Sequence, residues 1–269
     1  MCAAAMPSRA AMGLRILAIA GGVPPAEAAP AADLRLPDLR QLPPSQVQVR
    51  AAPEGRVVLA FRSAVANVGR GPLLVRGERG RGEATMRADQ LIRRDGGPPL
   101  VRRGVGRIAF VPGGHNHWHL AGFERFELRD PATGRRVARD HKTGFCLGDR
   151  FVVRPPVPCA SADPVISHNC SRGSPGIRGV TMGITVGWAD DYKAFLEDQF
   201  VDITAVRPGR YVLVHRADPA RRLRVGDRRD DVASALVALR RRAGDALPSA
   251  VVLASCPGSD GSPGRPCRP

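Results

Sequence analysis

The chain has 269 residues, too many for a peptide, and its hydrophobic fraction of 43% allows a real core. Its formal net charge is +16, almost all of it from arginine. With 25 prolines, 30 glycines and only 4% aromatic residues, it favours many turns and short strands around an aliphatic core over long helices.

The positive charge alone does not indicate a nucleic-acid partner. Arginines are scattered along the chain, as at Arg35, Arg76, Arg135 and Arg210. No recognisable nucleic-acid motif accompanies them. We therefore interpret the charge as a solvated surface and expect no specific nucleic acid; an anionic partner is the weaker alternative.

The N-terminus resembles a secretion signal. Arg9 gives a positive start, residues 12–23 are mostly apolar, and Ala26-Glu27-Ala28 fits a cleavage site. Arg15 breaks the apolar run, which is also too short for a membrane span. We predict a secreted or extracellular protein, bacterial cell envelope included, without a membrane span. The expected divisions are a signal peptide at 1–28, one folded domain at 29–254 and a Gly/Ser/Pro-rich tail at 255–269.

Strand patterns dominate the first half of the remaining chain. An extended, proline-rich lead-in is expected at 29–54, before the first strand. A charged, glycine-rich loop or irregular hairpin is expected at 77–97. The expected strands are 57–64, 73–75 and 107–111, then a strand pair over 115–128 and a strand region over 135–149.

The second half begins with a long loop over 150–178. Loops of this length are usually functional or cross-linked by disulfides. A strand is expected at 180–186, and 200–204 with 211–214 should form a hairpin around Arg207-Pro208-Gly209. Residues 232–239 form a strand or short helix. The fold class is therefore mainly β, a single β-sandwich-like domain with long loops and few short helices.

Five cysteines follow residue 28, which fits an oxidising compartment. Cys256 and Cys267 bracket the tail and are expected to pair. Cys146 is expected to pair with Cys170, which leaves Cys159 unpaired. Other pairings stay open, because connectivity cannot be read from spacing.

Three of the six histidines stand at His115, His117 and His119. In an extended strand, alternate side chains point to one face, so three imidazoles would converge there. Neutral imidazole suits copper, zinc, nickel and iron(II), and three protein ligands leave a position open for water or substrate. The pattern predicts an open metal site. A structural zinc site is the alternative, and the spacing does not choose the metal.

The segment from Gly114 to Asp149 resembles the copper-binding and cofactor segment of the lysyl oxidase family. That family shows H-x-H-x-H, a strand, then R-R-V-A-x-x-H-K-x-x-F-C-L; this chain reads GHNHWHLAGFERFELRDPATGRRVARDHKTGFCLGD. Downstream, GWADDY at 187–192 and QFVDIT at 199–204 resemble the family's D-x-Y and Q-W-I-D-I-T stretches, with Phe200 in place of tryptophan. The resemblance is close over 114–204 and loose over 36–240.

The resemblance implies copper at the three histidines and a lysine tyrosylquinone built from Lys142 and Tyr192. The chain has just two lysines and two tyrosines, and one of each stands at the matching position. Arginine could not replace Lys142, because its guanidinium stays protonated. The alternative is a surface lysine and a packing tyrosine.

The function implied is that of a copper-dependent amine oxidase acting on primary amines or peptidyl-lysine. The quinone carbonyl condenses with the amine, a base removes a proton from the α-carbon, and hydrolysis releases an aldehyde. Molecular oxygen reoxidises the cofactor, which gives ammonia and hydrogen peroxide. Asp190, two residues before Tyr192, is the candidate base; a solvated carboxylate is the alternative.

Some family members also bind calcium, between an early Asp-Leu and a late acidic cluster, E-x-D-x-x-N-N. Carboxylate oxygens suit calcium. Val225 replaces the glutamate of that cluster, and intervening arginines could instead pair with the aspartates. The matching positions for this possible calcium site are Asp38, Leu39, Asp227, Asp230 and Asp231.

Two other functions compete with amine oxidation. A secreted copper-binding protein could keep the same fold and form no quinone. A cupin-like metal enzyme is the other, since His117, His119 and Glu124 resemble the first half of a cupin motif. No convincing second half of that motif is present.

Overall fold

The computed structural model describes residues 34–140, 144–196 and 198–269. The expected signal segment and Lys142 lie outside these ranges. Strands dominate the described chain, and η2 (Pro53–Gly55) is the one helical segment within it, so the prediction of a mainly β chain is confirmed. No described helix has the length and apolarity needed to cross a membrane.

The first sheet has the strand order β10-β7-β6-β5-β4-β12, with β1 also paired to β5. Its strands are β1 (Leu34–Arg35), β4 (Leu73–Glu78), β5 (Thr85–Arg94), β6 (Leu100–Val111), β7 (His117–Ala121), β10 (Gly144–Phe145) and β12 (Gly179–Ile184). Of the two expectations for 77–97, a loop or an irregular hairpin, the structure has the hairpin, because β4 and β5 pair antiparallel there. Pairing on both sides, with β4 and β6, makes β5 a strand despite its charged residues.

The second sheet has the order β11-β13-β3-β14, with β2 also paired to β3. Its strands are β2 (Leu39–Ala52), β3 (Arg56–Asn67), β11 (Phe151–Val152), β13 (Trp188–Tyr192) and β14 (Phe200–Asp202). The expected lead-in at 29–54 is thus largely strand β2. The prolines are tolerated because β2 pairs only with β3, and the register shifts between Leu42 and Ser45.

The third sheet has the order β17-β16-β15-β8-β9. Its strands are β8 (Glu124–Arg129), β9 (Arg136–Arg139), β15 (Gly209–Ala217), β16 (Val232–Arg240) and β17 (Ser249–Pro257). The hairpin expected over 200–214 is wrong, because β14 pairs with β3 whereas β15 pairs with β8 and β16. Strand β17 also runs past residue 255, where the tail was expected to begin.

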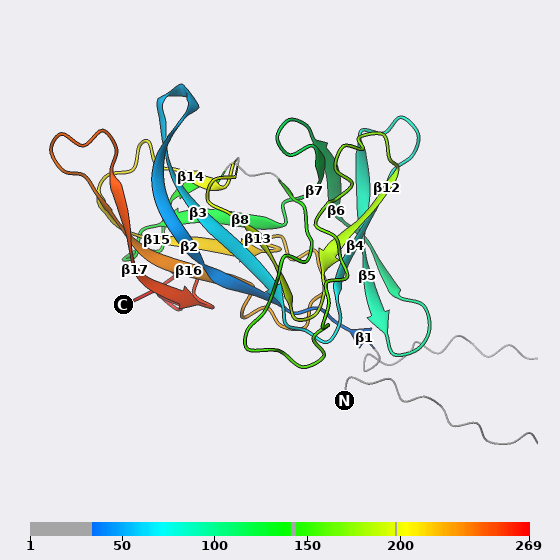
Figure 1. The fold of residues 1–269 in the computed structure, drawn as a ribbon. Helices are drawn as coiled ribbons and strands as arrows, with labels where there is room; N and C mark the ends of the chain where they lie inside the picture. The colour runs from blue at the N-terminus through cyan, green and yellow to red at the C-terminus, as the bar shows by residue number, and fades with distance from the viewer. Residues whose placement is uncertain (1–33, 141–143, 197) are drawn as a thin grey trace, which may run out of the picture.

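The second and third sheets pack face to face, and the first sheet stands beside them (Figure 1). Strand β2 lies against β15, β16 and β17. Phe61 of β3 and Phe126 of β8 are both fully buried, with ring centroids 4.9 Å apart. A continuous apolar core therefore joins the two layers and extends to buried residues of the first sheet.

Two disulfides confirm the expected pairs, Cys146–Cys170 and Cys256–Cys267. Cys159 is disulfide-bonded as well, so the expectation of an unpaired Cys159 is wrong.

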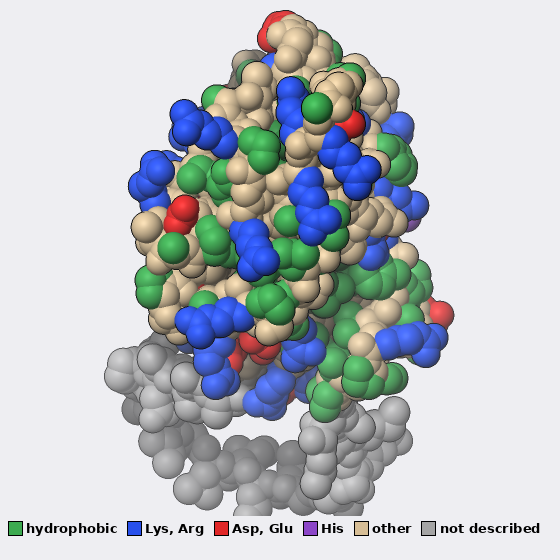
Figure 2. Space-filling model, turned by 90° about the vertical axis from the view of Figure 1, so that its left-hand side faces the viewer, with side chains coloured by type: hydrophobic (Ala, Val, Ile, Leu, Met, Phe, Trp, Pro, Cys, Tyr) green, Lys and Arg blue, Asp and Glu red, His purple; other side chains and the backbone are tan. Residues whose placement is uncertain are grey.

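Figure 2 shows one face of the molecule, on which the basic side chains are spread among apolar and uncharged residues. They do not merge into one continuous stripe on this face. This arrangement fits a solvated basic surface.

Candidate functional site

Two of the three histidines lie on strand β7, which forms a hairpin with β6. His117 pairs with Val111 and His119 with Ala109 in the antiparallel register. Both side chains are buried on one face, while Trp118 between them is buried on the other. The alternation expected for a strand is therefore confirmed for this pair.

His115 lies in the turn before β7, so the expectation of a strand through all three histidines is wrong. The turn extends beyond the Pro-Gly-Gly segment to Asn116, which has a φ of 50°. Asparagine tolerates this left-handed conformation better than most residues. The turn nevertheless brings the His115 ring within 4.8 Å of the His119 ring, centroid to centroid.

The three imidazoles form a compact donor set. Their ligand nitrogens all lie within 4.8 Å of one another, and Nε2 of His117 is 2.7 Å from Nε2 of His119. In the part of the chain that the structure describes, this is the one group of three or more His, Cys, Asp or Glu side chains placed to hold a metal. Nitrogen atoms so close and aimed together suit a borderline-soft ion such as copper or zinc.

Trp118 anchors the histidine hairpin to the rest of the fold. Its indole Nε1 donates to the Ser174 carbonyl at 3.1 Å, and its backbone N–H donates to the Cys170 carbonyl at 3.1 Å. The Arg79 guanidinium lies over the ring, 4.7 Å from its centroid. The loop before β12 thus fixes the strand that carries two of the three histidines.

Tyr192 ends strand β13 in a buried pocket. Its ring packs edge-on against Phe145, with centroids 4.9 Å apart. Its hydroxyl is within hydrogen-bond distance of the Cys146 carbonyl and of Oδ2 of Asp190, the latter at 2.9 Å. The expected tyrosine and the expected base are therefore in direct contact. The alternative of a solvated carboxylate at Asp190 is excluded, because its side chain is fully buried.

Asp190 and Tyr192 influence each other's ionisation. Burial raises the pKa of Asp190 to about 7, against the opposing effect of the Arg150 guanidinium, whose Nε donates to Oδ1 at 2.8 Å. Burial also raises the pKa of Tyr192 well above its ordinary value, and the charge of Asp190 adds to the increase. Near neutral pH the tyrosine keeps its proton, and the carboxyl group lies close to its titration midpoint.

A second buried carboxylate, Glu124, begins strand β8 nearby. It accepts hydrogen bonds from Nε2 of Gln41 and from Oγ of Ser63, both at 3.0 Å. Ser63 is the register partner of Tyr192 on the neighbouring strand. The charge of Glu124 contributes to the raised pKa values of both Asp190 and Tyr192, so this carboxylate belongs to the electrostatic surroundings of the site.

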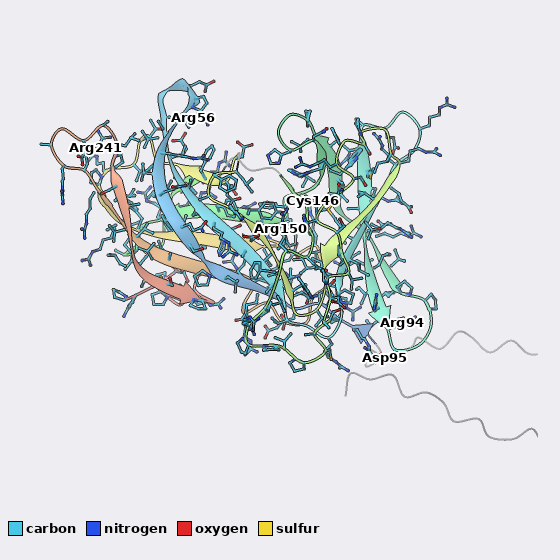
Figure 3. All side chains as sticks on the ribbon, in the orientation of Figure 1. Arg56, Arg94, Asp95, Cys146, Arg150 and Arg241 are labelled. Atoms are coloured by element: carbon cyan, nitrogen blue, oxygen red, sulfur yellow. A yellow bond between two sulfur atoms is a disulfide. The ribbon has the colours of Figure 1, made fainter. Side chains whose placement is uncertain are left out.

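The segment from Phe145 to Arg150 frames Tyr192 and is itself rigidly held. Asp149 accepts hydrogen bonds from the backbone N–H groups of Val165 and Thr185, each at 2.8 Å. Cys146 is tied to Cys170, whose carbonyl accepts the Trp118 N–H. The same segment therefore borders the tyrosine pocket and connects it to the histidine hairpin. Figure 3 labels Cys146 and Arg150 in the middle of the molecule.

Sequence reasoning missed Arg150, and it considered Glu124 only as a possible metal ligand. Arg150 and Asp190 are 40 positions apart, and antiparallel pairing of β11 with β13 brings them together. No local pattern encodes that contact. Lys142 lies outside the described residues, so its pairing with Tyr192 stays a prediction.

The two segments of the expected calcium site are adjacent. The Gly226 N–H donates to the Pro37 carbonyl and the Gln41 N–H to the Asp230 carbonyl, each at 2.8 Å. Leu39 is fully buried in the core, and Oδ1 of Asp38 is buried without a hydrogen-bond partner. The late carboxylates carry arginine partners: Asp227 with Arg229, Asp230 with Arg40 and Asp231 with Arg228, at 2.6, 3.5 and 3.1 Å. The pairs of Arg228 and Arg229 are those expected as the alternative to calcium, and Arg40 adds a third; calcium binding stays a prediction.

Comparison with known proteins places this site in context. Residues 111–240 match the family model for lysyl oxidase. Lysyl oxidase homolog 1 of Homo sapiens is 33% identical over 106 residues, which cover 39% of this chain and 16% of the relative. Protein-lysine 6-oxidase of Sus scrofa is 32% identical over 110 residues, covering 39% of this chain and 37% of the relative. The human protein-lysine 6-oxidase gives 32% over 110 residues, and 22% of its length is covered. The chain thus spans well under half the length of these relatives.

Proposed function

We propose that this chain, a member of the lysyl oxidase family through residues 111–240, is a copper-dependent amine oxidase that converts primary amines or peptidyl-lysine to aldehydes. The observation that carries the proposal is the gathering of the His115, His117 and His119 nitrogens within 4.8 Å of one another. A buried tyrosine in contact with a carboxyl group supports it.

The residues present fit copper. Three imidazoles supply nitrogen donors, and three protein ligands leave a position open on the ion. When bound, copper with oxygen would supply the oxidation of Tyr192 that, with the Lys142 amine, yields a lysine tyrosylquinone able to accept electrons from an amine.

The other described residues would prepare that chemistry. Phe145 and the Cys146 carbonyl hold the Tyr192 ring and hydroxyl in one orientation. Asp190 lies at 2.9 Å from that hydroxyl and, when ionised, can take up a proton at Oδ2. Burial of this pocket excludes bulk water, which strengthens every charge interaction within it.

The substrate and compartment follow from the same chemistry. A primary amine is the proposed substrate class, with peptidyl-lysine as its macromolecular form and molecular oxygen as the acceptor. Disulfides such as Cys146–Cys170 persist in oxidising environments, so we place the activity outside the cytosol.

The decisive experiment treats the purified, copper-loaded, aerated chain with phenylhydrazine and maps its peptides by mass spectrometry. We expect a coloured adduct and a joined species containing Lys142 and Tyr192. Copper bound to a chain whose two peptides stay separate and unmodified would contradict the proposal. The chain would then be a non-catalytic copper-binding protein.

The chain carries its own matched controls, because it has two lysines and two tyrosines. Lys142→Arg and Tyr192→Phe should abolish the adduct, since arginine is not a usable nucleophile and phenylalanine lacks the phenol. Lys193→Arg and Tyr211→Phe should keep it.

The cupin-like alternative is less well supported. Glu124 would have to join His117 and His119 as a metal ligand. Among the described residues, the group of side chains placed to hold a metal consists of the three histidines and does not include Glu124. The glutamate instead accepts hydrogen bonds from Gln41 and Ser63.

A further inference from the structure

We propose that Arg150 is a positioning residue that favours the ionised form of the Asp190 carboxyl group and holds it turned toward Tyr192. The inference rests on the proposed function only in naming Asp190 as the base of the reaction. The arrangement itself is a property of the folded chain, so it can be measured without copper or quinone.

The geometry gives each oxygen of Asp190 a separate partner. Oδ1 accepts the Nε–H of Arg150 at 2.8 Å, and Oδ2 faces the Tyr192 hydroxyl at 2.9 Å. A carboxylate held at one oxygen by a guanidinium presents the other in a fixed direction. The Arg150 guanidinium carbon also lies 6.0 Å from the centroid of the Tyr192 ring, so one arginine borders both members of the pair.

Arg150 links this buried pair to the outside. Its side chain is 30% exposed, whereas the Asp190 side chain is fully buried. Its own backbone is fixed, because its N–H donates to the Ala189 carbonyl at 3.0 Å. The preceding residue, Asp149, is locked by the hydrogen bonds described above. The guanidinium thus stays hydrated on one side while it neutralises a carboxylate that burial alone would protonate.

The remaining charges around Asp190 make this arginine important. Glu124, from β8, is negative and opposes ionisation of Asp190. Tyr192, on the same strand, favours the ionised form by hydrogen bonding. Arg62 of β3 instead binds the neighbouring Asp191, at 2.7 Å. Among the described residues, Arg150 is therefore the basic side chain that contacts Asp190.

The single hydroxyl proton of Tyr192 allows two arrangements. With Asp190 ionised, the hydroxyl donates to Oδ2. With Asp190 protonated, the hydroxyl donates to the Cys146 carbonyl and accepts a hydrogen bond from the aspartic acid O–H. Only the first arrangement leaves Asp190 able to take up a proton, and the positive charge of Arg150 favours it.

The test is a pH titration of the carboxyl carbons by NMR, on copper-free protein labelled with ¹³C-aspartate. Asp190→Asn identifies the Asp190 signal by its loss. We expect Arg150→Met to move the titration midpoint of that signal to higher pH, by about one to three pH units. Arg150→Lys should retain most of the unsubstituted midpoint, because it keeps the charge.

Two further variants separate charge from structure. Arg150→Gln keeps a hydrogen-bond donor without the charge, so it should shift the midpoint as Arg150→Met does, and it serves if the methionine variant fails to fold. Arg62→Met removes the matched ion pair on the adjacent residue and should leave the Asp190 midpoint unchanged. An unchanged midpoint in folded Arg150→Gln, or an equal shift in Arg62→Met, overturns the inference.

The same variants give a second readout in the copper-loaded protein. With activity normalised to phenylhydrazine-reactive sites, kcat/KM of Arg150→Gln should fall about tenfold or more at pH 7 and recover as pH rises. A normalised loss that is the same at all pH values would contradict the inference. If no variant oxidises amines but the midpoint still shifts, the proposed function fails and the role of Arg150 in ionising Asp190 stands.

Discussion

The histidine hairpin and the tyrosine pocket are built in different ways. Three histidines within five consecutive positions come together because a single turn and a single strand place them there. The surroundings of Tyr192 come instead from β3, β8, β13 and the 145–150 segment. The donor set of the hairpin thus comes from one short segment, whereas the pocket depends on the assembled sandwich.

That difference has a physical consequence. A local site is stabilised by turn geometry and by a few anchors such as Trp118. A site assembled from distant strands shares its stability with the core, so substitutions there change ionisation and folding together. The following predictions test this contrast, from the largest expected effect to the smallest.

The largest effect should come from a ligand. His119→Ala removes one of three convergent nitrogens, and we expect copper affinity to fall by about 100-fold or more. Competition with a chromophoric chelator measures the change. His168→Ala, at an exposed histidine on the long loop, is the control and should bind copper normally. Equal affinity in the two variants would refute the three-histidine site.

Removal of the central disulfide should come next. Cys146 and Cys170 are 24 positions apart, so replacing both with serine should lower the free energy of unfolding by about 3 kcal/mol. Thermal or denaturant unfolding measures it. Replacing Cys256 and Cys267, 11 positions apart, should cost a comparable amount but leave phenylhydrazine reactivity intact. Equal loss of reactivity in both variants would mean that the central disulfide has no specific role at the site.

The two tryptophans offer a matched pair. Trp118 and Trp188 each donate an indole N–H to a backbone carbonyl at 3.1 Å. Replacement of either by phenylalanine should cost about 1 kcal/mol of unfolding free energy through the lost hydrogen bond. Only Trp118→Phe should also weaken copper binding, because Trp118 anchors the hairpin. Weaker copper binding in Trp188→Phe but not in Trp118→Phe would show that the hairpin needs no such anchor.

The smallest effect should come from Glu124→Gln. The negative charge of Glu124 helps to raise the pKa of Asp190, so its removal should lower that pKa from about 7. More Asp190 is then ionised near pH 6, and the acid limb of kcat/KM should move to lower pH. The shift should be smaller than that of Arg150→Met and opposite in sign. A shift to higher pH would contradict these electrostatics.

Sequence reasoning reached the parts of the fold that local patterns encode. The i, i+2 spacing predicted the shared face of His117 and His119. The family resemblance named Asp190 and Tyr192 as candidates, and the structure shows that they are in contact on β13. Sequence reasoning failed for His115, where a turn replaces strand, and it missed the pairing of β2, whose residues were expected only as part of a proline-rich extended lead-in. In β2 the long pairing with β3 overrides the local signal.

The contacts that complete the site could not be predicted in this way. Arg150 reaches Asp190, and Ser63 reaches Glu124, only because strands distant in sequence pair and two sheets pack. Nothing in the composition around either residue indicates its partner. Burial then sets the chemistry, since the same aspartate in water would titrate near pH 4.

The two cysteines of the Cys146–Cys170 disulfide each contact one part of the site. The Cys146 carbonyl lies within hydrogen-bond distance of the Tyr192 hydroxyl, and the Cys170 carbonyl accepts the Trp118 N–H. Thermodynamic linkage is reciprocal. If closing the disulfide favours the hairpin geometry that binds metal, then bound metal must make the disulfide harder to reduce, by the same factor. Zinc binds imidazole without redox chemistry, so thiol–disulfide equilibration with and without zinc would measure that factor. Metal binding and disulfide formation would then each favour the other as the protein matures.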